Sequence, residues 1–438
     1  MDPSRRSFLK SGSALMAGIG IGAFVPFELL AANRKRVSAS DRINIAAIGI
    51  NGMGWSDLNA LLKNPEVNLV ALCDVDENVL QRRVAELAKA GIKVKTYIDY
   101  REVLDIKEID AVLIATPDHW HCLIMTDACA AGKDVYCEKP IGRTIAECRV
   151  MEAAQKKYNR VVQVGQWQRS MQHFGDAVAF VQSGKLGRIR NVKAWAYQGW
   201  MKPIAVKADQ PVPKGVHYDR WLGPAPERPF NPNRFHFNFR WFYDYAGGLM
   251  TDWGVHLIDY ILLGMKATYP RSVTATGGKI GYPNDAEEWP DTMSTLYDFG
   301  DFVGIWEQAV GINGGPYHRD HGIAYIGNNG TLVLDRGGWE VIPEGDQMAR
   351  IPYIKASDNG LDNHTKNFVE VIGSRKMEDL HCPVQAAALV AANCHMGNIA
   401  QLTNNKVFWD THKDAFTDHK SNAYLYPQYH NHYKFPTI

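Results

Sequence analysis

The sequence predicts an α/β protein of two domains: an N-terminal doubly wound parallel sheet, then an α+β domain with a mostly antiparallel sheet. Two observations lead to this prediction. Up to about residue 163, short apolar runs rich in β-branched residues alternate with helical patterns, as in strands joined by helices. Further on, short β-rich runs are separated by Gly, Asn or Asp turns, which is typical of antiparallel strands. At 438 residues and 46% hydrophobic, the chain can bury the cores that this fold needs.

Residues 1–32 are expected to be a twin-arginine signal peptide. Residues 4–10 carry the arginine pair, an apolar run follows over residues 14–25, and a small-residue ending allows cleavage after Ala32. The apolar run is shorter than the roughly 20 residues that a bilayer span requires, so no permanent membrane anchor is expected. The pattern predicts export to the periplasm through the twin-arginine translocase, with residues 33–41 as a linker. The alternative is a basic N-terminus without a targeting role.

The first domain, residues 42–163, is expected to bind a dinucleotide. A buried strand over residues 43–48 leads directly into a glycine-rich turn and then a helical pattern. Such a turn lets the backbone approach a pyrophosphate, whose charge is met by the helix N-terminus. Asn51 holds the second glycine position of the usual spacing, and it is expected to tolerate a left-handed backbone there. The predicted cofactor contacts in this turn are Gly49, Asn51, Gly52, Met53 and Gly54.

The second strand, over residues 67–73, ends in Asp74, twenty positions after Gly54. A carboxylate at this place in a dinucleotide-binding (Rossmann) domain bonds the adenosine ribose hydroxyls. No Arg directly follows Asp74 to receive a 2′-phosphate, which favours NAD over NADP. The alternative is a solvated carboxylate at a strand end.

Two further strands, over residues 109–115 and 134–137, also end in polar clusters. The carboxyl ends of parallel strands are where such sheets bind ligands. With the residue that follows the strand at 161–165, these clusters complete the predicted cofactor contacts: Thr116, Pro117, Asp118, His121, Glu138, Lys139 and Gln166.

The Glu138-Lys139-Pro140 triplet, together with the glycine turn, resembles the signature of the glucose-fructose oxidoreductase and inositol dehydrogenase (Gfo/Idh/MocA) family. This resemblance implies that Lys139 lies beside the nicotinamide and acts on the reacting hydroxyl. A surface lysine in a loop is the alternative. The resemblance also implies that the second domain has a large open sheet whose outer face mediates homo-dimer or homo-tetramer contacts.

The second domain is expected to cover residues 164–412. Strands are predicted at 189–197, 271–276, 293–299, 303–310, 322–326 and 331–334, and helices before Gly184 and over 383–402. The tail, residues 413–438, is rich in His and Tyr but carries no interpretable motif.

Asp252 and His256 are the remaining catalytic candidates. They are four positions apart, so on one helix they share a face. Histidine is suited to removing a hydroxyl proton near neutral pH. The pair also resembles the D-x-x-x-H pattern of inositol dehydrogenases. The alternative is an aspartate favoured by the helix dipole beside a core histidine.

An aromatic-rich segment, residues 231–245, precedes this pair. Aromatic and polar side chains in alternation suit a sugar, whose ring faces stack while its hydroxyls accept directional bonds. An interface or core segment is an equal alternative. The candidate substrate contacts are Trp167, Arg169, Arg234, His236, Trp241, Tyr243 and Asp252.

Composition excludes other classes. A formal net charge of +1 gives no support for a nucleic-acid partner. The seven cysteines are odd in number and lack C-x-x-C spacing, so neither a disulfide framework nor a zinc site is expected. No metal site is expected in the tail, whose histidines lack ligand spacing.

The expected function is NAD(H)-dependent oxidation or reduction of a sugar, glycoside or polyol hydroxyl. His256 would act as acid/base, Asp252 would orient it or bind a second hydroxyl, and Lys139 would stabilise the developing alkoxide. An exported enzyme is expected to hold its cofactor tightly and recycle it. Three alternatives stay open: a redox-neutral NAD-dependent glycosidase, a dehydrogenase that forms 3-keto-glycosides, and a non-catalytic sugar-binding protein. The glycosidase branch has a Thr-His pair where this chain has Thr251-Asp252.

Overall fold

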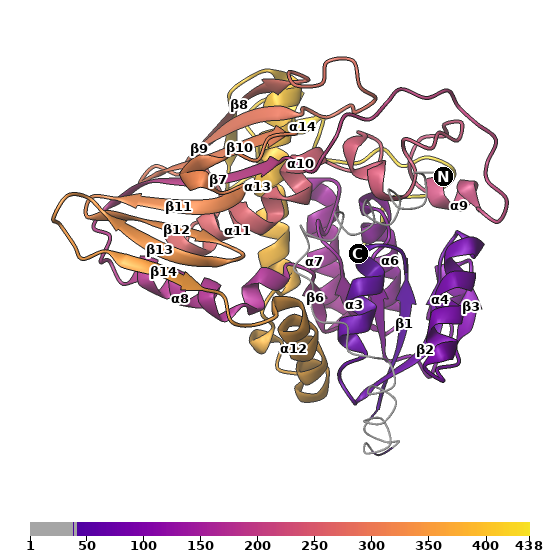
Figure 1. Ribbon diagram of the computed structural model, residues 1–438. Helices are drawn as coiled ribbons and strands as arrows, with labels where there is room; N and C mark the ends of the chain where they lie inside the picture. Colours follow the sequence, from indigo (N-terminus) through magenta and orange to yellow (C-terminus); the bar gives the residue numbers. More distant parts are fainter. Residues whose placement is uncertain (1–37, 39–41) are drawn as a thin grey trace, which may run out of the picture.

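The computed structural model describes Ser38 and residues 42–438 (Figure 1). The predicted signal peptide and most of the linker lie outside the described residues. Within the described part, no helix has the length and apolar character needed to cross a membrane.

The first sheet has six parallel strands in the order β3-β2-β1-β4-β5-β6, which confirms the doubly wound prediction. The order reverses at β1, which lies between β2 and β4. Adjacent residues of β1 point into different cores: Ile45 and Ala47 pack in one, Ala46 and Ile48 in the other. A strand buried on both faces explains its continuous apolar run. The strands are β1 (Ile43–Ile48), β2 (Val67–Cys73), β3 (Lys95–Tyr97), β4 (Ala111–Ile114), β5 (Asp134–Cys137) and β6 (Val162–Val164).

Helices connect these strands and cover both faces of the sheet (Figure 1). Helix α7 begins with a capping box, in which Thr144 and Glu147 satisfy each other's free backbone N–H groups. The helices are α3 (Met53–Leu61), α4 (Glu77–Lys89), α5 (Tyr100–Leu104), α6 (Asp118–Ala130) and α7 (Ile145–Tyr158).

The second sheet has ten strands in the order β14-β13-β12-β11-β7-β10-β9-β8-β15-β16. Only β7 and β10 pair in parallel, so the prediction of a mostly antiparallel sheet is confirmed. Four of its strands, β13 to β16, were not predicted, because their runs are short and interrupted by Gly, Pro or charged residues. The strands are β7 (Ile189–Gln198), β8 (Ser272–Gly278), β9 (Thr292–Asp298), β10 (Val303–Val310), β11 (His321–Gly327), β12 (Gly330–Asp335), β13 (Gly338–Pro343), β14 (Ile351–Lys355), β15 (Val407–Asp410) and β16 (Ala415–Phe416).

One face of this sheet is covered by helices α8, α11 and α13 (Figure 1). The opposite face leaves apolar side chains of the central strands exposed: Leu296 of β9 is 50% and Val303 of β10 is 38% accessible. The helices of this part are α8 (Gln172–Gln182), α9 (Tyr218–Leu222), α10 (Gly248–Asp252), α11 (Gly254–Met265), α12 (Gly360–Ser374), α13 (Val384–Thr403) and α14 (His419–Asn422), with 3-10 turns η3 (Trp167–Ser170), η4 (His236–Trp241), η5 (Pro316–His318) and η6 (Met377–Asp379).

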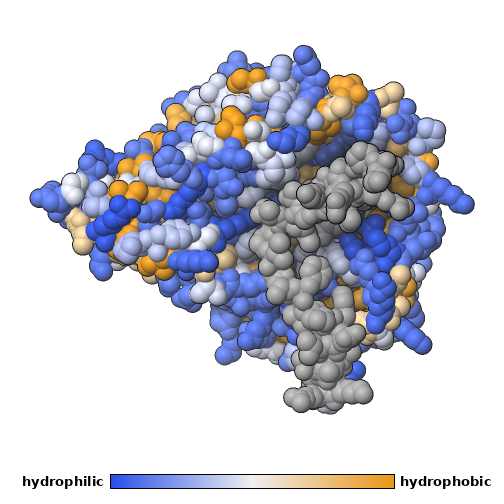
Figure 2. Space-filling view, viewed as in Figure 1, coloured by the Kyte–Doolittle hydropathy of each residue, from blue (hydrophilic) through white to orange (hydrophobic). Residues whose placement is uncertain are grey.

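Two late segments pack back onto the first domain. Phe368 and Val371 of α12 join the core that contains Leu58 of α3. In the tail, the Tyr429 hydroxyl donates to Glu147 Oε1 at 2.8 Å, and the ring of Tyr433 lies edge-on to that of Trp120 at 5.2 Å. The view in Figure 2 is mostly hydrophilic, with apolar residues in small separate groups.

Candidate active site

The glycine turn after β1 is built for close backbone approach. A Cβ at Gly54 would lie 2.1 Å from the Gly49 carbonyl oxygen, and one at Gly49 would lie 2.7 Å from the Ala115 backbone. Gly52 takes the positive φ of +50°. Asn51 has no positive φ, so its expected tolerance of a left-handed backbone is not used here; the next residue, a glycine, takes the positive φ at no steric cost. This cradle fits the pyrophosphate of a dinucleotide at the N-terminus of α3.

Asp74 stabilises the turn from the end of β2. Its carboxylate accepts hydrogen bonds from the backbone N–H of Ile50 and of Asp76, each at 3.0 Å. Burial raises the pKa of this carboxyl to about 6. Each oxygen keeps a lone pair, so the group can still bond ribose hydroxyls.

Two arginines of α4 also lie at this turn. Arg82 Nη2 donates to Asn51 Oδ1 at 3.2 Å, and Arg83 Nε donates to the Ile50 carbonyl at 3.3 Å. Both arginines lie on α4, several positions after Asp74, so the residue that directly follows Asp74 gives no indication of them. Arginines near the adenosine ribose suit a 2′-phosphate, so this turn by itself does not discriminate between NAD and NADP.

Lys139 and Asp252, predicted as catalytic, meet at the carboxyl ends of the parallel strands. Lys139 Nζ donates to Asp252 Oδ1 and to its carbonyl oxygen, both at 2.9 Å. Arg240 Nε lies 3.3 Å from the same Oδ1. Burial alone would raise the Asp252 pKa, but the two cations lower it to about 2. Asp252 is therefore an ionised anchor that sets the position of the Lys139 ammonium group. The sequence did not indicate Arg240 as a member of this group.

Other carboxyl groups near Lys139 are held towards the neutral form. Burial raises the pKa of Asp118 to about 8, although Arg240 and Lys139 oppose the shift. Glu138 and Asp57 form a buried pair. Burial raises the pKa of both carboxyl groups, and repulsion from Glu138 raises the pKa of Asp57 further. Among the described residues, neither Asp57 oxygen has a hydrogen-bond partner, so burial holds this pair under the Lys139 loop towards its neutral form.

His256 lies in the first turn of α11 and is buried, with 4% of its surface accessible. Asp252 ends α10 and Trp253 separates the two helices, so the expectation of one continuous helix is wrong. Burial, with the nearby Lys139 and Arg336 cations next in weight, lowers the His256 pKa well below its usual value. The imidazole is therefore neutral at pH 7, and its enclosed Nδ1 has no hydrogen-bond partner among the described residues. A neutral imidazole can accept a proton.

Trp167 is the one predicted substrate contact seen to pack directly beside His256, with ring centroids 6.2 Å apart. Arg336, from the turn after β12, stacks on Trp167 at 4.8 Å. The sequence offered no signal for Arg336, because it follows β12 in an unremarkable hairpin turn.

Four other predicted contacts have their side chains engaged elsewhere. The Arg169 guanidinium forms a buried pair with Asp259, with Nε–Oδ2 at 2.8 Å. Gln166 Nε2 donates to the Val255 carbonyl and to Asp259, so its side-chain amide is bonded to α11. Trp241 is 4% accessible and belongs to the core. Arg234 donates to the Pro229 carbonyl at 2.7 Å and pairs with Asp209.

His236 lies at the nucleotide end and not beside His256. Its Nε2 is 3.0 Å from Asp76 Oδ2, and its Nδ1 is 3.2 Å from the Asn51 amide nitrogen. Tyr243 is 39% accessible and packs on Trp289. Part of the aromatic segment therefore belongs to the core, and Arg240 from the same segment reaches Asp252.

The loop after β4 is tied to the loop after β5. His121 Nδ1 lies 2.8 Å from the Pro140 carbonyl, and its Nε2 lies 2.8 Å from the Thr116 carbonyl. The Lys139–Pro140 peptide bond is cis. The Thr116 hydroxyl is buried with no hydrogen-bond partner in the described part of the chain, and Pro117 precedes the first turn of α6. These contacts hold the two predicted cofactor loops together.

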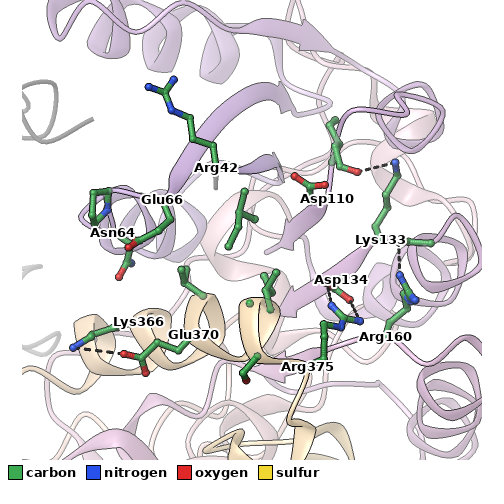
Figure 3. Close-up of a pocket in the computed structure, with 18 of the residues that line it drawn as sticks. Arg42, Asn64, Glu66, Asp110, Lys133, Asp134, Arg160, Lys366, Glu370 and Arg375 are labelled. Carbon is green, nitrogen blue, oxygen red and sulfur yellow. Dashed lines mark hydrogen bonds and ion pairs between the residues drawn. The ribbon is translucent and has the colours of Figure 1, made fainter. Parts of the chain in front are cut away.

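A large cavity of about 1020 Å³ lies away from these residues, at the amino ends of the parallel strands (Figure 3). Its charged side chains are largely paired: Arg375 with Asp134, and Lys133 with the carbonyls of Ile106 and Ile109. Ligands of such sheets bind at the other end. Within the described residues, no group of three or more His, Cys, Asp or Glu side chains is arranged to hold a metal ion.

Comparison with protein families agrees with this geometry. Residues 43–166 match the NAD-binding Rossmann fold of an oxidoreductase family, and residues 179–435 match its C-terminal alpha/beta domain. The chain belongs to this Gfo/Idh/MocA oxidoreductase family.

Individual relatives cover parts of the chain. Inositol 2-dehydrogenase of Salmonella typhimurium (strain LT2) is 34% identical over 143 residues, which are 32% of this chain and 42% of that protein. Glycosyl hydrolase family 109 protein 1 of Shewanella sp. (strain ANA-3) is 29% identical over 161 residues, 33% of this chain and 35% of that protein. The chain thus spans less than half the length of each. Among solved structures, levoglucosan dehydrogenase in complex with NADH shares the fold, with a TM-score of 0.63 at 20% identity, over 84% of this chain and 99% of that one.

Proposed function

We propose that this protein is an NAD(H)-dependent oxidoreductase that acts on a hydroxyl of a sugar, glycoside or polyol. The observation that carries the proposal is the meeting of Lys139, ionised Asp252 and neutral His256 at the carboxyl ends of the parallel strands. The similarity to inositol 2-dehydrogenase and to a levoglucosan dehydrogenase fold supports a carbohydrate substrate.

The cradle formed by Gly49, Gly52 and Gly54, with Asp74, would hold the dinucleotide. When bound, NAD supplies the group that accepts or donates hydride. We assign it as NAD because of Asp74, although Arg82 and Arg83 leave NADP as the second candidate. A cofactor titration with both dinucleotides tests this assignment.

The side chains of the site account for the proton transfer. His256 is neutral, so it can take the substrate hydroxyl proton as general base and return it in the reverse direction. The Lys139 ammonium group, positioned by Asp252, stabilises negative charge that develops on the substrate oxygen. Asp252 is a positioning residue for Lys139, because its carboxylate is engaged by two cations.

The glycosidase alternative is supported by the similarity to a glycosyl hydrolase family 109 protein. Two measurements separate the candidates. The protein is denatured and its supernatant assayed for nicotinamide, which tests for tightly bound cofactor. It is then incubated with sugars and aryl glycosides, and NADH absorbance, keto-sugar and released aglycone are measured. Net NADH or keto-sugar supports the oxidoreductase; aglycone without net NADH supports the redox-neutral glycosidase. If no NADH, keto-sugar or aglycone appears and the bound nicotinamide is unperturbed, a non-catalytic sugar-binding role replaces the oxidoreductase and glycosidase proposals.

We propose further that the protein is exported through the twin-arginine translocase and works in the periplasm with a tightly held, internally recycled cofactor. The paired arginines at residues 5 and 6 support this. Fractionation of cells that express the chain with Arg5 and Arg6 replaced by lysine tests it: export should be lost.

The exposed face of the ten-stranded sheet supports a homo-dimer or homo-tetramer, because Leu296 and Val303 present apolar surface there. Light scattering of the wild type and of Leu296→Lys tests this proposal. Dissociation by the variant is the expected result.

A further inference from the structure

Arg336 stands out among the charged residues of the active site. Its guanidinium carbon lies 4.8 Å from the ring centroid of Trp167 and 4.5 Å from that of Trp253. Arginine stacks well on aromatic faces, which fix the plane of its fork of N–H donors. Two tryptophans therefore hold this guanidinium in one orientation, beside the His256 ring that also faces Trp167.

Arg336 has no ion-pair partner among the described residues. Its one hydrogen bond runs from Nη2 to the Gln168 side-chain oxygen at 3.2 Å. Its Nε is enclosed without a partner, whereas Nη1 is neither bonded nor fully enclosed. Burial lowers the pKa of the group to about 10, so it stays charged at neutral pH. A half-buried guanidinium charge without a bonded anion destabilises the folded protein, and a bound anionic ligand removes this destabilisation.

The nearby acidic groups do not neutralise it. Asp252 attracts Arg336, but its carboxylate is already engaged by Lys139 and Arg240. Asp118 and Glu138 are held towards their neutral forms by burial. Asp320 also attracts Arg336, but its Oδ1 lies 2.6 Å from His321 Nδ1 and is engaged there. The three cations of the site therefore face two ionised carboxylates, and each of these already has another partner. The remaining positive charge lies on the side of His256 and Trp167.

We propose that Arg336 binds a carboxylate group of the substrate, so that the preferred substrate is an acidic sugar such as a uronic or aldonic acid. This inference rests on the proposed function and narrows its substrate class. A planar guanidinium fork matches a carboxylate in two parallel hydrogen bonds. The carboxylate would fix the sugar ring relative to His256, and Trp167 offers a face on which the ring can stack.

The test compares acids with their neutral counterparts on the wild-type protein loaded with NAD. The pairs are glucuronate with its methyl ester and with glucose, and galacturonate with galactose; glucose 6-phosphate represents a different anion. Half-saturation and rate are measured from single-turnover NADH formation. A charge-assisted pair is expected to lower the half-saturating concentration of the acid about 10- to 100-fold relative to its ester.

The variants Arg336→Gln and Arg336→Lys complete the test. Arg336→Gln is expected to bring the acid-to-ester ratio close to one, and Arg336→Lys to retain part of it. Retained NAD and the unfolding midpoint show whether each variant is folded; if Arg336→Gln is not, the acid and ester on wild type still decide. Equal use of acid and ester, or preference for the phosphate, overturns the inference while leaving the proposed function intact. Absence of NADH with every sugar instead defeats the proposed function.

Discussion

Replacement of Asp252 by Asn removes the charge that holds the two site cations. The pKa of Asp252 falls from 3.8 to about 2 on folding, and each pKa unit corresponds to about 1.4 kcal/mol. The native interaction is thus worth roughly 2 to 3 kcal/mol at pH 7. Little is lost to solvent screening, because the Asp252 side chain is only 15% accessible. In Asp252→Asn, Lys139 and Arg240 would also repel each other without compensation, which acts in the same direction.

Urea unfolding at several pH values measures this effect. Because the folded pKa is depressed, the stabilisation is fully present above about pH 4 and is lost as pH falls towards 2. The difference between wild type and Asp252→Asn should therefore be largest near pH 7 and shrink below pH 4. Asp346→Asn, which changes an exposed carboxylate in the loop after β13, is the matched control and should unfold like wild type. Equal stability of Asp252→Asn and wild type at pH 7 would refute the reasoning.

Three further outcomes are expected. Gly54→Ala should weaken NAD binding, measured by calorimetry, at least about tenfold, because the new Cβ would lie 2.1 Å from the Gly49 carbonyl oxygen. The control Gly373→Ala has open space around the new Cβ in α12 and should bind NAD normally. Unchanged binding by both variants would contradict the role of the glycine turn in binding the dinucleotide. Arg169→Met should lower the unfolding free energy by about 3 to 5 kcal/mol, because it leaves the buried Asp259 carboxylate without a countercharge and with only the Gln166 amide bonded to it among the described residues. A loss under about 1 kcal/mol would argue against that pair. Since the His256 pKa lies well below 6.5, single-turnover rates should show no His256 titration between about pH 6 and 8, and an inflection near 6.5 that disappears in His256→Asn would contradict the neutral imidazole.

The sequence located much of the site, because strand ends are visible in a sequence. Lys139 is the second residue after β5 and Asp74 directly follows β2, and parallel strands place their carboxyl ends at one edge. Arg240 and Arg336 could not be found this way. Arg240 comes from the 3-10 turn η4 and Arg336 from the turn after β12. Only packing within the second domain brings Arg240 near Asp252 and Arg336 near His256.

The aromatic segment illustrates the same limit. Its composition suited a sugar site and a core equally, and local pattern cannot distinguish the two. Folding placed Trp241 in the core and His236 against Asn51 of the glycine turn. Both positions depend on contacts between residues far apart in the sequence.

The sequence by itself determined that a parallel sheet is followed by a mostly antiparallel sheet. Strands β1, β2, β5 and β10 have the predicted bounds, because hydrophobic periodicity and turn residues are properties of short stretches of sequence. Only the tertiary structure decided how the parts combine. It joined α12 to α3, separated α10 from α11 at Trp253, and left Arg336 charged between two tryptophans. These outcomes depend on burial and on long-range charge, which leave no periodic trace in the chain.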